Sequence, residues 1–453
     1  MSGPSEGDAT PITSLRQMVE HIAGGTKPRE AWRIGTEHEK IVFRTADLDP
    51  PPYEGESGIR ALLEGVAATG WEPVRDAGNV IGLKRDKANV SLEPGGQFEL
   101  SGAPMADLHA TKAELDEHLG VAGEVGERLG LGFLPHGFHP LKRRDEMPWM
   151  PKSRYAIMRR YMPLKGSLGL DMMLRTSTVQ VNLDFADEAD MVEKFRISLA
   201  LQPVAIALFA NSPFTEGKPN GFRSFRANVW TDTDPDRCGI PSFVFEKGFG
   251  YERWVEYLLD VPMYFVMREG RYVDLAGQSF RAFLEGRLPA LPGERPTMGD
   301  FADHITTAFT EVRLKRYLEM RGADSGPPEM LMALPALWTG LLYDKGAQAE
   351  ALALITDHPC GDYQTLHRDV PRLGLAAPWC DGTVRSLARE VVAVAKRGLV
   401  ARGLGEEVYL APLEEIAATG RTLADRWLER YETAWGGDVS RIFAEGALRP
   451  RNG

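Results

Sequence analysis

The segment RTSTVQVNLDF, residues 175–185, decides the fold class of this chain. Apolar side chains alternate with polar ones along it: Val179, Val181, Leu183 and Phe185 against Thr178, Gln180, Asn182 and Asp184. A period of two residues is typical of a β-strand with one buried face. The other face carries amide and hydroxyl groups, which either meet water or line a polar cavity. The segment therefore predicts a strand of a half-buried sheet.

Strand and helix patterns continue outward from this segment in both directions. The other strand-like segments are residues 33–43, 89–100 and 131–138, and helical spacing follows residues 14–25, 57–70, 105–130, 381–403 and 422–435. Short βα units in series and a glycine-rich turn after a strand are both missing, so a doubly wound parallel sheet is not favoured. We expect an α+β fold, with a large, mostly antiparallel sheet and surrounding helices.

The domain organisation follows from length and linkers. A chain of 453 residues can hold up to about three domains. However, no linker rich in proline, glycine or serine divides it. We expect one compact catalytic domain over residues 1–453, with a sheet-rich core at about 30–325 and a helical C-terminal part at about 326–453.

Composition and charge exclude several classes of protein. Hydrophobic residues make up 43% of the chain, which is enough to build a large core and excludes global disorder. The formal net charge of -11 argues against binding to nucleic acids or to anionic membranes. The most apolar stretch, residues 197–210, is too short to span a bilayer and reads as a buried helix. A local basic site for a small anion remains compatible with this charge.

Cysteine usage and the first residues bear on location. The chain has three cysteines and no CxxC pair, which indicates a reducing compartment. Free thiols are favoured, although Cys360 and Cys380 could form one regulatory bridge. Residues 1–14 contain neither an apolar run nor leading positive charges, so no secretory signal is expected. These features predict a cytoplasmic protein.

Two strand-like segments carry pairs of glutamates. In RIGTEHEKIVF, residues 33–43, a strand would place Glu37 and Glu39 on one face. In VSLEPGGQFELSGAP, residues 90–104, Glu93 and Glu99 flank a turn at Pro94–Gly95–Gly96. A water-facing strand and the protection of a sheet edge are the plain explanations. Four glutamates on two strands also suit Mg²⁺, which prefers hard oxygen ligands and is usually shared with substrate phosphates.

Three basic segments could serve an anionic substrate. Arg223 and Arg226 stand among aromatic residues, where they would either hold a carboxylate or phosphate or stack on the surface. Residues 141–166 are rich in lysine and arginine, which suits either a phosphate-bearing ligand or a solvated face. Residues 310–324 contain two E-x-R units, Glu311 with Arg313 and Glu319 with Arg321. In a strand, the glutamate and the arginine of each unit would lie on the same face. A helix is the alternative for residues 314–320.

Taken together, six motifs resemble one known family. They are GTEHEK (residues 35–40), SLEPGGQFELSGAP (91–104), FLPHGFHP (133–140), RTSTVQVNLDF (175–185), NSPFTEGKPNGFRSFRANVWTDTDPDRCG (211–239) and YLEMRGAD (317–324). The set resembles the plant-type branch of glutamate–cysteine ligase, shared with many bacteria, in the carboxylate–amine ligase group related to glutamine synthetase. The motifs span most of the chain in order.

This resemblance implies a fold and a reaction. The fold would be a glutamine-synthetase-like ligase core, with a sheet-lined funnel that holds Mg²⁺ and ATP against the carboxylates. The reaction would join L-glutamate to L-cysteine through a γ-glutamyl phosphate, giving γ-glutamylcysteine, ADP and phosphate, the first step of glutathione synthesis. Small-molecule substrates would be the partners, and the protein would be a monomer or a weak homodimer. The few cysteines argue against the redox control of higher-plant members.

The resemblance also implies a role for each site residue. The expected metal ligands are Glu37, Glu39, Glu93, Glu99, Gln180 and Glu319. Arg321 would neutralise the transferring phosphoryl group, and Arg226 would act with it and hold the α-carboxylate of glutamate. Further substrate contacts are expected from Arg223, Asn182 and Thr178, and nucleotide contacts from Lys165 and Arg160. The alternatives are a ligase for another amine, a phosphotransferase on the same fold, and a non-catalytic nucleotide or metal sensor.

Overall fold

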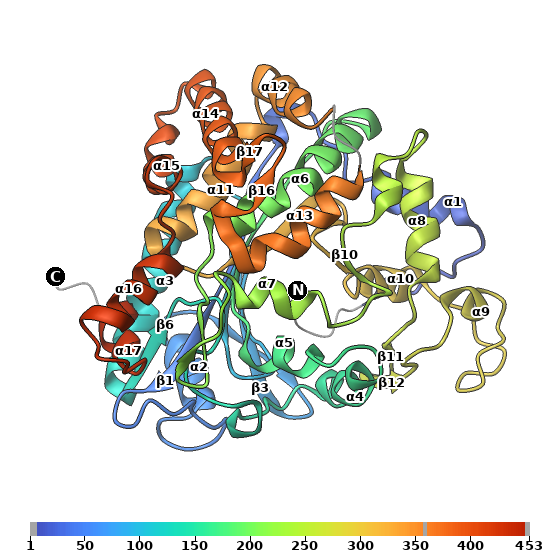
Figure 1. Ribbon diagram of the computed structural model, residues 1–453. Coiled ribbons are helices and arrows are strands. Elements are labelled where there is room, and N and C mark those ends of the chain that lie inside the picture. The colour runs from blue at the N-terminus through green and yellow to red at the C-terminus, as the bar shows by residue number, and fades with distance from the viewer. Residues whose placement is uncertain (1–6, 357–359, 449–453) are drawn as a thin grey trace.

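A nine-stranded sheet forms the centre of the computed structural model, which describes residues 7–356 and 360–448 (Figure 1). The strand order is β14-β15-β7-β1-β5-β4-β3-β2, and β6 also pairs with β1. The strands are β1 (Ile34–Arg44), β2 (Glu72–Asp76), β3 (Asn79–Arg85), β4 (Ala88–Leu92), β5 (Phe98–Ser101), β6 (Leu131–Leu134), β7 (Thr178–Leu183), β14 (Val312–Leu314) and β15 (Leu318–Asp324). All the pairings described within this sheet are antiparallel, which confirms the predicted fold class.

Helices surround the sheet and make up most of the chain after β15 (Figure 1). They are α1 (Leu15–Ala23), α2 (Ile59–Ala67), α3 (Leu108–Leu129), α4 (Ser153–Tyr161), α5 (Gly169–Arg175), α6 (Glu188–Leu208), α7 (Phe225–Trp230), α8 (Tyr251–Asp260), α9 (Phe280–Leu284), α10 (Met298–Ile305), α11 (Pro328–Leu342), α12 (Lys345–Thr356), α13 (Cys360–Leu373), α14 (Val384–Arg402), α15 (Ala411–Thr419), α16 (Leu423–Thr433) and α17 (Arg441–Gly446). Four two-stranded pieces complete the description: β8 (Phe214–Thr215) with β9 (Lys218–Pro219), β10 (Cys238–Gly239) with β13 (Phe309–Thr310), β11 (Phe265–Arg268) with β12 (Arg271–Asp274), and β16 (Pro378–Trp379) with β17 (Gly382–Thr383). The division into one domain with a helical part stays a prediction.

Strand β7 shows why the alternating segment belongs at the centre. Val179, Val181 and Leu183 are 0% exposed and belong to the main hydrophobic core, which also holds the buried faces of α6 and α11. Burying such side chains contributes about 1.5–3 kcal/mol each. The opposite face of β7 carries Thr178 and Gln180, which line a cavity. Of the predicted residues 197–210, residues 197–208 form a buried helix, as the second half of α6. Among the described residues, helices long and apolar enough to cross a bilayer do not occur.

The segment at residues 89–100 forms a hairpin, with β4 and β5 joined by the Pro94–Gly96 turn. Glu93 N donates to Gln97 O at 3.0 Å, and Gly96 N donates to Glu93 O at 2.9 Å. A Cβ on Gly95 would overlap the carbonyl oxygen of Leu174, so the turn needs glycine there. The turn thereby presses Glu93 into the space between the sheet and α5.

The E-x-R segment forms the two paired strands β14 and β15 and contains no helix. Arg313 on β14 pairs in register with Glu319 on β15, and Glu319 pairs in turn with Asn182 on β7. The register then shifts between Met320 and Ala323. Such a β-bulge turns the side chains near it away from the regular alternation. The helical alternative for residues 314–320 is therefore wrong.

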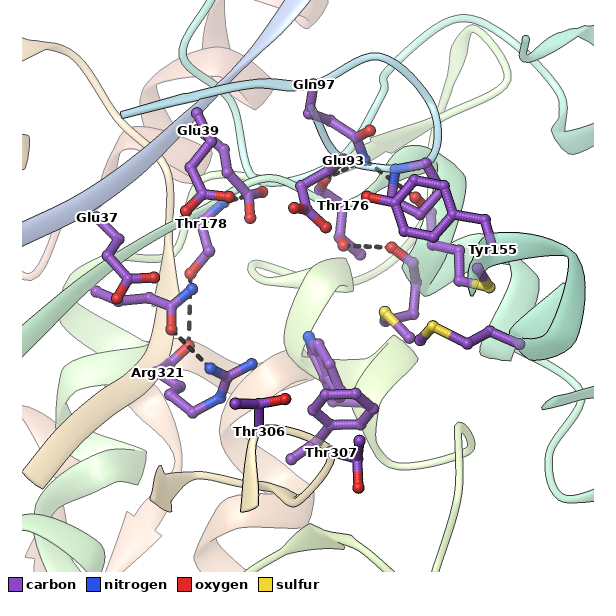
Figure 2. A pocket seen from close by; sticks show the side chains of 18 of the residues that line it. Glu37, Glu39, Glu93, Gln97, Tyr155, Thr176, Thr178, Thr306, Thr307 and Arg321 are labelled. Carbon is purple, nitrogen blue, oxygen red and sulfur yellow. Dashed lines mark hydrogen bonds between the residues drawn. The ribbon is translucent and has the colours of Figure 1, made fainter. Parts of the chain in front are cut away.

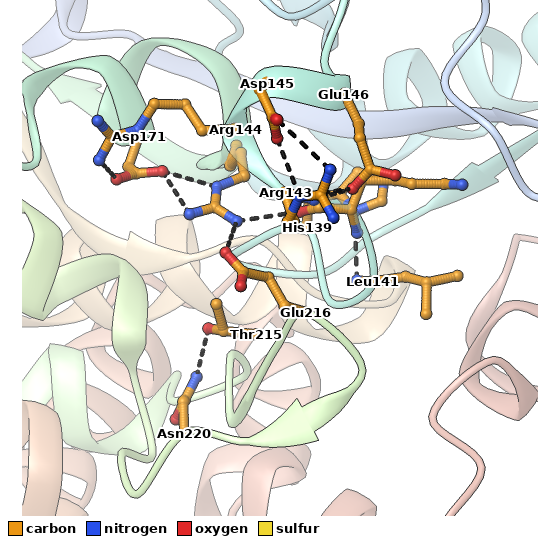
Figure 3. A network of polar contacts seen from close by, with 12 residues as sticks. His139, Leu141, Arg143, Arg144, Asp145, Glu146, Asp171, Thr215, Glu216 and Asn220 are labelled. Carbon is orange, nitrogen blue, oxygen red and sulfur yellow. Dashed lines mark hydrogen bonds and ion pairs between the residues drawn. The ribbon is translucent and has the colours of Figure 1, made fainter.

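Most cations of the basic stretch, residues 141–166, form ion pairs that hold loops together. Figure 3 shows Arg143 with Asp145 and Glu146, and Arg144 with Asp171. Asp171 is 1% exposed and also accepts from Arg175 Nε at 2.7 Å. The stretch is thus explained largely by local pairing, while Arg154 within it lines the cavity described below.

His139 lies at the base of this network and is 0% exposed (Figure 3). Its Nδ1 accepts from the backbone N–H of Lys142 at 3.1 Å, and its Nε2 has no hydrogen-bond partner among the described residues. Burial, with help from the charges of Arg175 and Lys142, lowers the pKa of His139 to about 3. The folded protein therefore keeps this ring neutral.

We predict that His139→Asn makes stability less dependent on pH. Below its ordinary pKa of about 6.5, histidine takes up a proton in the unfolded chain, whereas His139 in the folded chain does not until about pH 3. This difference makes the folded state less stable as the pH falls through that range. Thermal unfolding between pH 4 and 6 should show a slope that is shallower by up to about 1.4 kcal/mol per pH unit in the variant.

The control is Asn220→Ala, which removes a bond to Thr215 Oγ1 at 3.1 Å without removing a titrating group. Asn220→Ala should lower stability equally at each pH. Parallel curves for the wild type and His139→Asn would contradict the prediction.

Candidate active site

One cavity is lined by both acidic and basic side chains, and Glu37, Glu39, Glu93 and Arg321 among them are seen in Figure 2. Its acids are Glu37, Glu39, Glu93 and Glu99, and its cations are Arg154, Arg226, Arg313, Lys315 and Arg321. The strands β1, β5, β7, β14 and β15 contribute side chains to it, as do α4, α5, α7, β11, β13, the turn between β4 and β5 and the loop at Thr306 and Thr307. Groups of opposite charge from distant parts of the sequence therefore share one concave site.

Register places the glutamates together. Glu39 on β1 lies opposite Glu99 on β5, and Glu37 on β1 lies opposite Gln180 on β7. Glu39 also accepts from the backbone N–H of Thr178 at 3.1 Å. Because all of these positions share one face of the sheet, the carboxylates converge above β1.

Burial and mutual repulsion raise the pKa of two of these acids. The pKa of Glu39 lies well above its ordinary value because the carboxyl is buried and lies near Glu93 and Glu99. The pKa of Glu99 is raised by burial and by Glu93, although Ser101 Oγ donates to it at 2.7 Å. Buried like charges are costly unless a cation or protons compensate them. The cluster is therefore suited to a cation.

The donor set fits magnesium better than a metal held by protein alone. Within the described part of the chain, groups of three or more His, Cys, Asp or Glu close enough to hold a metal ion are not found. Mg²⁺ is usually held by one or two carboxylates together with substrate phosphates and water. Glutamates that share a cavity without forming a complete protein ligand set match that pattern.

Glu319 lies beneath the basic side of the cavity. It is 0% exposed and receives a bidentate contact from Arg313, with Nε at 2.7 Å and Nη2 at 2.9 Å. Lys315 Nζ and Arg321 Nη1 lie 3.2 and 3.1 Å from its oxygens. Burial alone would raise the pKa of Glu319, but these three cations hold it well below the ordinary value. Its predicted metal role stays a prediction; here it fixes three cations at the cavity wall.

The polar residues of β7 connect the two sides. Gln180 Oε1 accepts from Arg321 Nη1 at 2.8 Å, and Asn182 Nδ2 donates to Glu37 Oε1 at 2.9 Å. Thr178 Oγ1 donates to Ala323 O at 2.8 Å. Thr178 and Gln180 line the cavity, whereas Asn182 orients Glu37 from the side.

Three of the residues predicted to contact substrate or nucleotide lie outside the cavity, and a fourth binds backbone carbonyls. Arg223 pairs with Asp425, Arg160 with Asp274 and Lys165 with Asp236, at 2.5, 2.6 and 2.5 Å, and these three do not line the cavity. Arg226 does line it, but both terminal nitrogens of its guanidinium donate to the backbone carbonyls of Arg321 and Gly322. Their predicted contacts with substrate or nucleotide stay predictions.

Sequence patterns missed several residues of the cavity wall. Arg154 and Tyr155 lie in the basic stretch and Lys315 in the E-x-R segment, and none of them was assigned a role; Arg313 was considered as a phosphate-binding arginine of its E-x-R unit but was not among the expected site residues. Arg313 and Lys315 could have been found from their position in the sequence, since they come shortly before the strand that carries Glu319 and Arg321. No sequence pattern singles out Arg154. It differs from the ion-paired cations of the basic stretch only because α4 places it at the cavity.

Relatives and solved structures were compared with this chain. A glutamate–cysteine ligase from Brassica juncea, named as chloroplastic, is 53% identical over 96% of this chain and 85% of its own length. The chloroplastic enzyme of Arabidopsis thaliana is 52% identical over 96% of this chain and 83% of its own length. A crystal structure of glutamate–cysteine ligase from Francisella tularensis in complex with AMP is 11% identical, with a TM-score of 0.53 over 91% of this chain and 88% of that one. That structure supports the fold.

The predicted cytoplasmic location is overturned by these relatives. Enzymes that share about half of their residues with this chain over 96% of its length are named as chloroplastic. A low cysteine count indicates a reducing environment, and this property does not identify one compartment among several. The prediction of a cytoplasmic location was wrong because it rested on the cysteine count, which bears only on the redox state of the compartment.

The family model described as glutamate-cysteine ligase family 2 matches residues 33–445, which include the strands and loops that form the cavity. This match spans most of the chain and agrees with the relatives. The chain therefore belongs to the glutamate–cysteine ligase family 2.

Proposed function

We propose that this protein joins the γ-carboxylate of L-glutamate to the amine of L-cysteine, using ATP. The products would be γ-glutamylcysteine, ADP and phosphate. One observation carries the proposal: four glutamates, four arginines and a lysine line a single cavity. A site that must hold two anions within reacting distance needs both kinds of charge. The activity named for the relatives is the same.

The first step would activate glutamate. A carboxylate is a poor acyl donor, so its γ-oxygen attacks the γ-phosphorus of ATP, and ADP leaves. Arg313, Lys315 and Arg321 would stabilise the charge on the phosphoryl oxygens, since Glu319 keeps all three at the wall. Arg154 and Arg226 are the cations left to bind the α-carboxylate of glutamate.

Magnesium would complete the acidic side. We propose Glu37, Glu39, Glu93 and Glu99 as the residues that hold Mg²⁺, with Gln180 and Glu319 as further candidates. When bound, the ions would shield the phosphate charges and orient the γ-phosphoryl group. The raised pKa of Glu39 and of Glu99 reflects burial and like charge without such an ion.

The second step would form the amide. The neutral amine of cysteine attacks the acyl carbon of γ-glutamyl phosphate, and phosphate leaves. The proton of the amine would pass to phosphate or water, and we assign no general base to this chain. Exclusion of water matters here because acyl phosphates hydrolyse. The apolar side chains Met158, Trp230 and Phe309 line the cavity and limit access of water.

The cavity is small in this structure. Its volume is about 150 Å³, which is below the roughly 300–1,000 Å³ of ordinary ligand sites. ATP with two amino acids would require the cavity to widen. The helix α4 is one wall of it and is joined to the β11–β12 hairpin by the exposed pair of Arg160 and Asp274.

We predict ADP formation that requires glutamate, cysteine and Mg²⁺ together. The assay couples ADP release to a dye signal and identifies the peptide by mass spectrometry. A better acceptor than cysteine in a panel of amines would change the assigned acceptor. A phosphorylated product without free phosphate would indicate a phosphotransferase, and ATP binding without turnover would indicate a sensor.

We predict that Glu93→Gln lowers kcat by roughly 10³-fold or more, since a ligand and a charge next to the reacting phosphate are lost. The melting temperature should not fall, because the substitution removes a like charge that lies near Glu39 and Glu99. Glu72→Gln is the matched control, as Glu72 is an exposed residue of β2 paired with Lys84. Full activity of Glu93→Gln would show that the metal lies elsewhere.

Glu319→Gln separates the two roles considered for Glu319. If it only fixes the cations, the variant should bind ATP about ten-fold more weakly and keep its dependence on Mg²⁺ concentration. If it is a metal ligand, the Mg²⁺ concentration needed for half-maximal activity should rise. Titration of Mg²⁺ at saturating ATP distinguishes these results, and the structure favours the first.

A further inference from the structure

Polar groups of three segments fix the backbone that carries Arg321. Arg321 N donates to Glu311 O at 3.0 Å, and Gly322 N donates to Gln202 Oε1 on α6 at 3.1 Å. On the carbonyl side, Arg226 Nη2 and Nη1 donate to Arg321 O and Gly322 O at 2.9 and 3.1 Å. The bulge of β15 is thus held by three different segments of the chain.

The side chain of Glu311 lies directly behind this bulge. It is 6% exposed, and its Oε1 lies 2.9 Å from Nε2 of His367 on α13. Its Oε2 is buried without a hydrogen-bond partner among the described residues. A Cβ on Gly322 would overlap this oxygen, so the glycine leaves the space that the carboxylate occupies.

Glu311 is a charged group close to two cations of the cavity. Burial would raise the pKa of Glu311, but His367, Arg226 and Arg321 outweigh burial and lower it. Neither Glu311 nor His367 lines the cavity. Arg226 and Arg321 also lie near enough to repel each other. A negative charge behind them offsets that repulsion.

The helix α13 connects this pair to the C-terminal helical part. The carbonyl of Pro371 at its end accepts from the backbone N–H groups of Arg223 and Ser224 at 2.8 and 2.9 Å, next to α7. Arg226 belongs to α7, which begins directly after Ser224. Helix α13 therefore contacts the start of α7 through Pro371, and it contacts Glu311 through His367. The helix can therefore transmit its position to both arginines.

We propose that Glu311 and His367 are positioning residues, which hold Arg226 and Arg321 in place for the anionic substrates without touching them. The inference rests on the proposed function and deepens it. Both residues act through the arginines, so their loss should affect the substrate that those arginines contact. The KM for cysteine, which is the acceptor and reacts through its neutral amine, should change least.

The experiment compares Glu311→Gln, His367→Leu and His367→Gln with the wild type. Glu311→Gln and His367→Leu should raise KM for glutamate and lower kcat, about ten-fold in kcat/KM, the usual size for a supporting partner. KM for cysteine should stay within about two-fold. His367→Gln, which can still donate to Glu311, should keep kcat/KM within roughly three-fold of the wild type.

Gln364→Ala is the matched control. Gln364 lies one turn earlier on α13, and its Nε2 donates to Ile240 O at 3.2 Å, away from Glu311. This variant loosens α13 without touching the pair and should leave KM for glutamate unchanged. Equal loss of kcat in all the variants, with every KM unchanged, would overturn the proposal, because that is the result of partial unfolding.

Calorimetric titration with glutamate decides the proposal independently of turnover. Glu311→Gln should bind glutamate about ten-fold more weakly than the wild type. Equal affinity would overturn the positioning role even in an active enzyme. A wild type that binds glutamate but shows no cysteine-dependent turnover would instead overturn the proposed function, and the titration would still decide the role of Glu311.

Discussion

Charge balance across one cavity is the constraint on which this structure depends. Glu37, Glu39, Glu93 and Glu99 line the cavity, and burial together with the charge of Glu93 raises the pKa of Glu39 and Glu99. Glu319 gathers the three cations Arg313, Lys315 and Arg321. Neither cluster would be stable by itself in a buried site. The antiparallel register of β5, β1, β7 and β15 keeps them at a fixed separation.

The hydrophobic core makes this arrangement possible. The apolar face of β7 is fully buried in the core that also contains α6 and α11. A slip of the strand by one residue would exchange its apolar and polar faces, so the register is fixed. The same constraint fixes which side chains of β1 and β15 reach the cavity. Where regular pairing would misplace a side chain, the bulge of β15 and the Pro94–Gly96 turn interrupt it. Irregular backbone thus occurs where the site needs it.

Alternation and residue type were sufficient to predict β1, β4, β5, β6 and β7, whereas β2 and β3 were not predicted. The pattern at residues 175–185 is strong because it has one fully buried face, and Glu37 and Glu39 share a face by the period of a strand. The basic stretch at residues 141–166 was harder. Arg143, Arg144 and Arg154 are the same residue type within a few positions, yet only Arg154 among them lines the cavity. Partners such as Asp171 come from other segments and leave no local signal.

The sequence by itself determined the α+β class, the face that each glutamate of β1 occupies and the family, since these follow from period, residue type and ordered motifs. Only the tertiary structure decided which cations face the glutamates, that both terminal guanidinium nitrogens of Arg226 bind backbone carbonyls, and that Glu319 lies beneath three cations. The physical reason is distance along the chain. Side-chain charges interact over a few ångströms in space, and the segments that supply them are brought together by sheet register and helix packing, which no local pattern encodes.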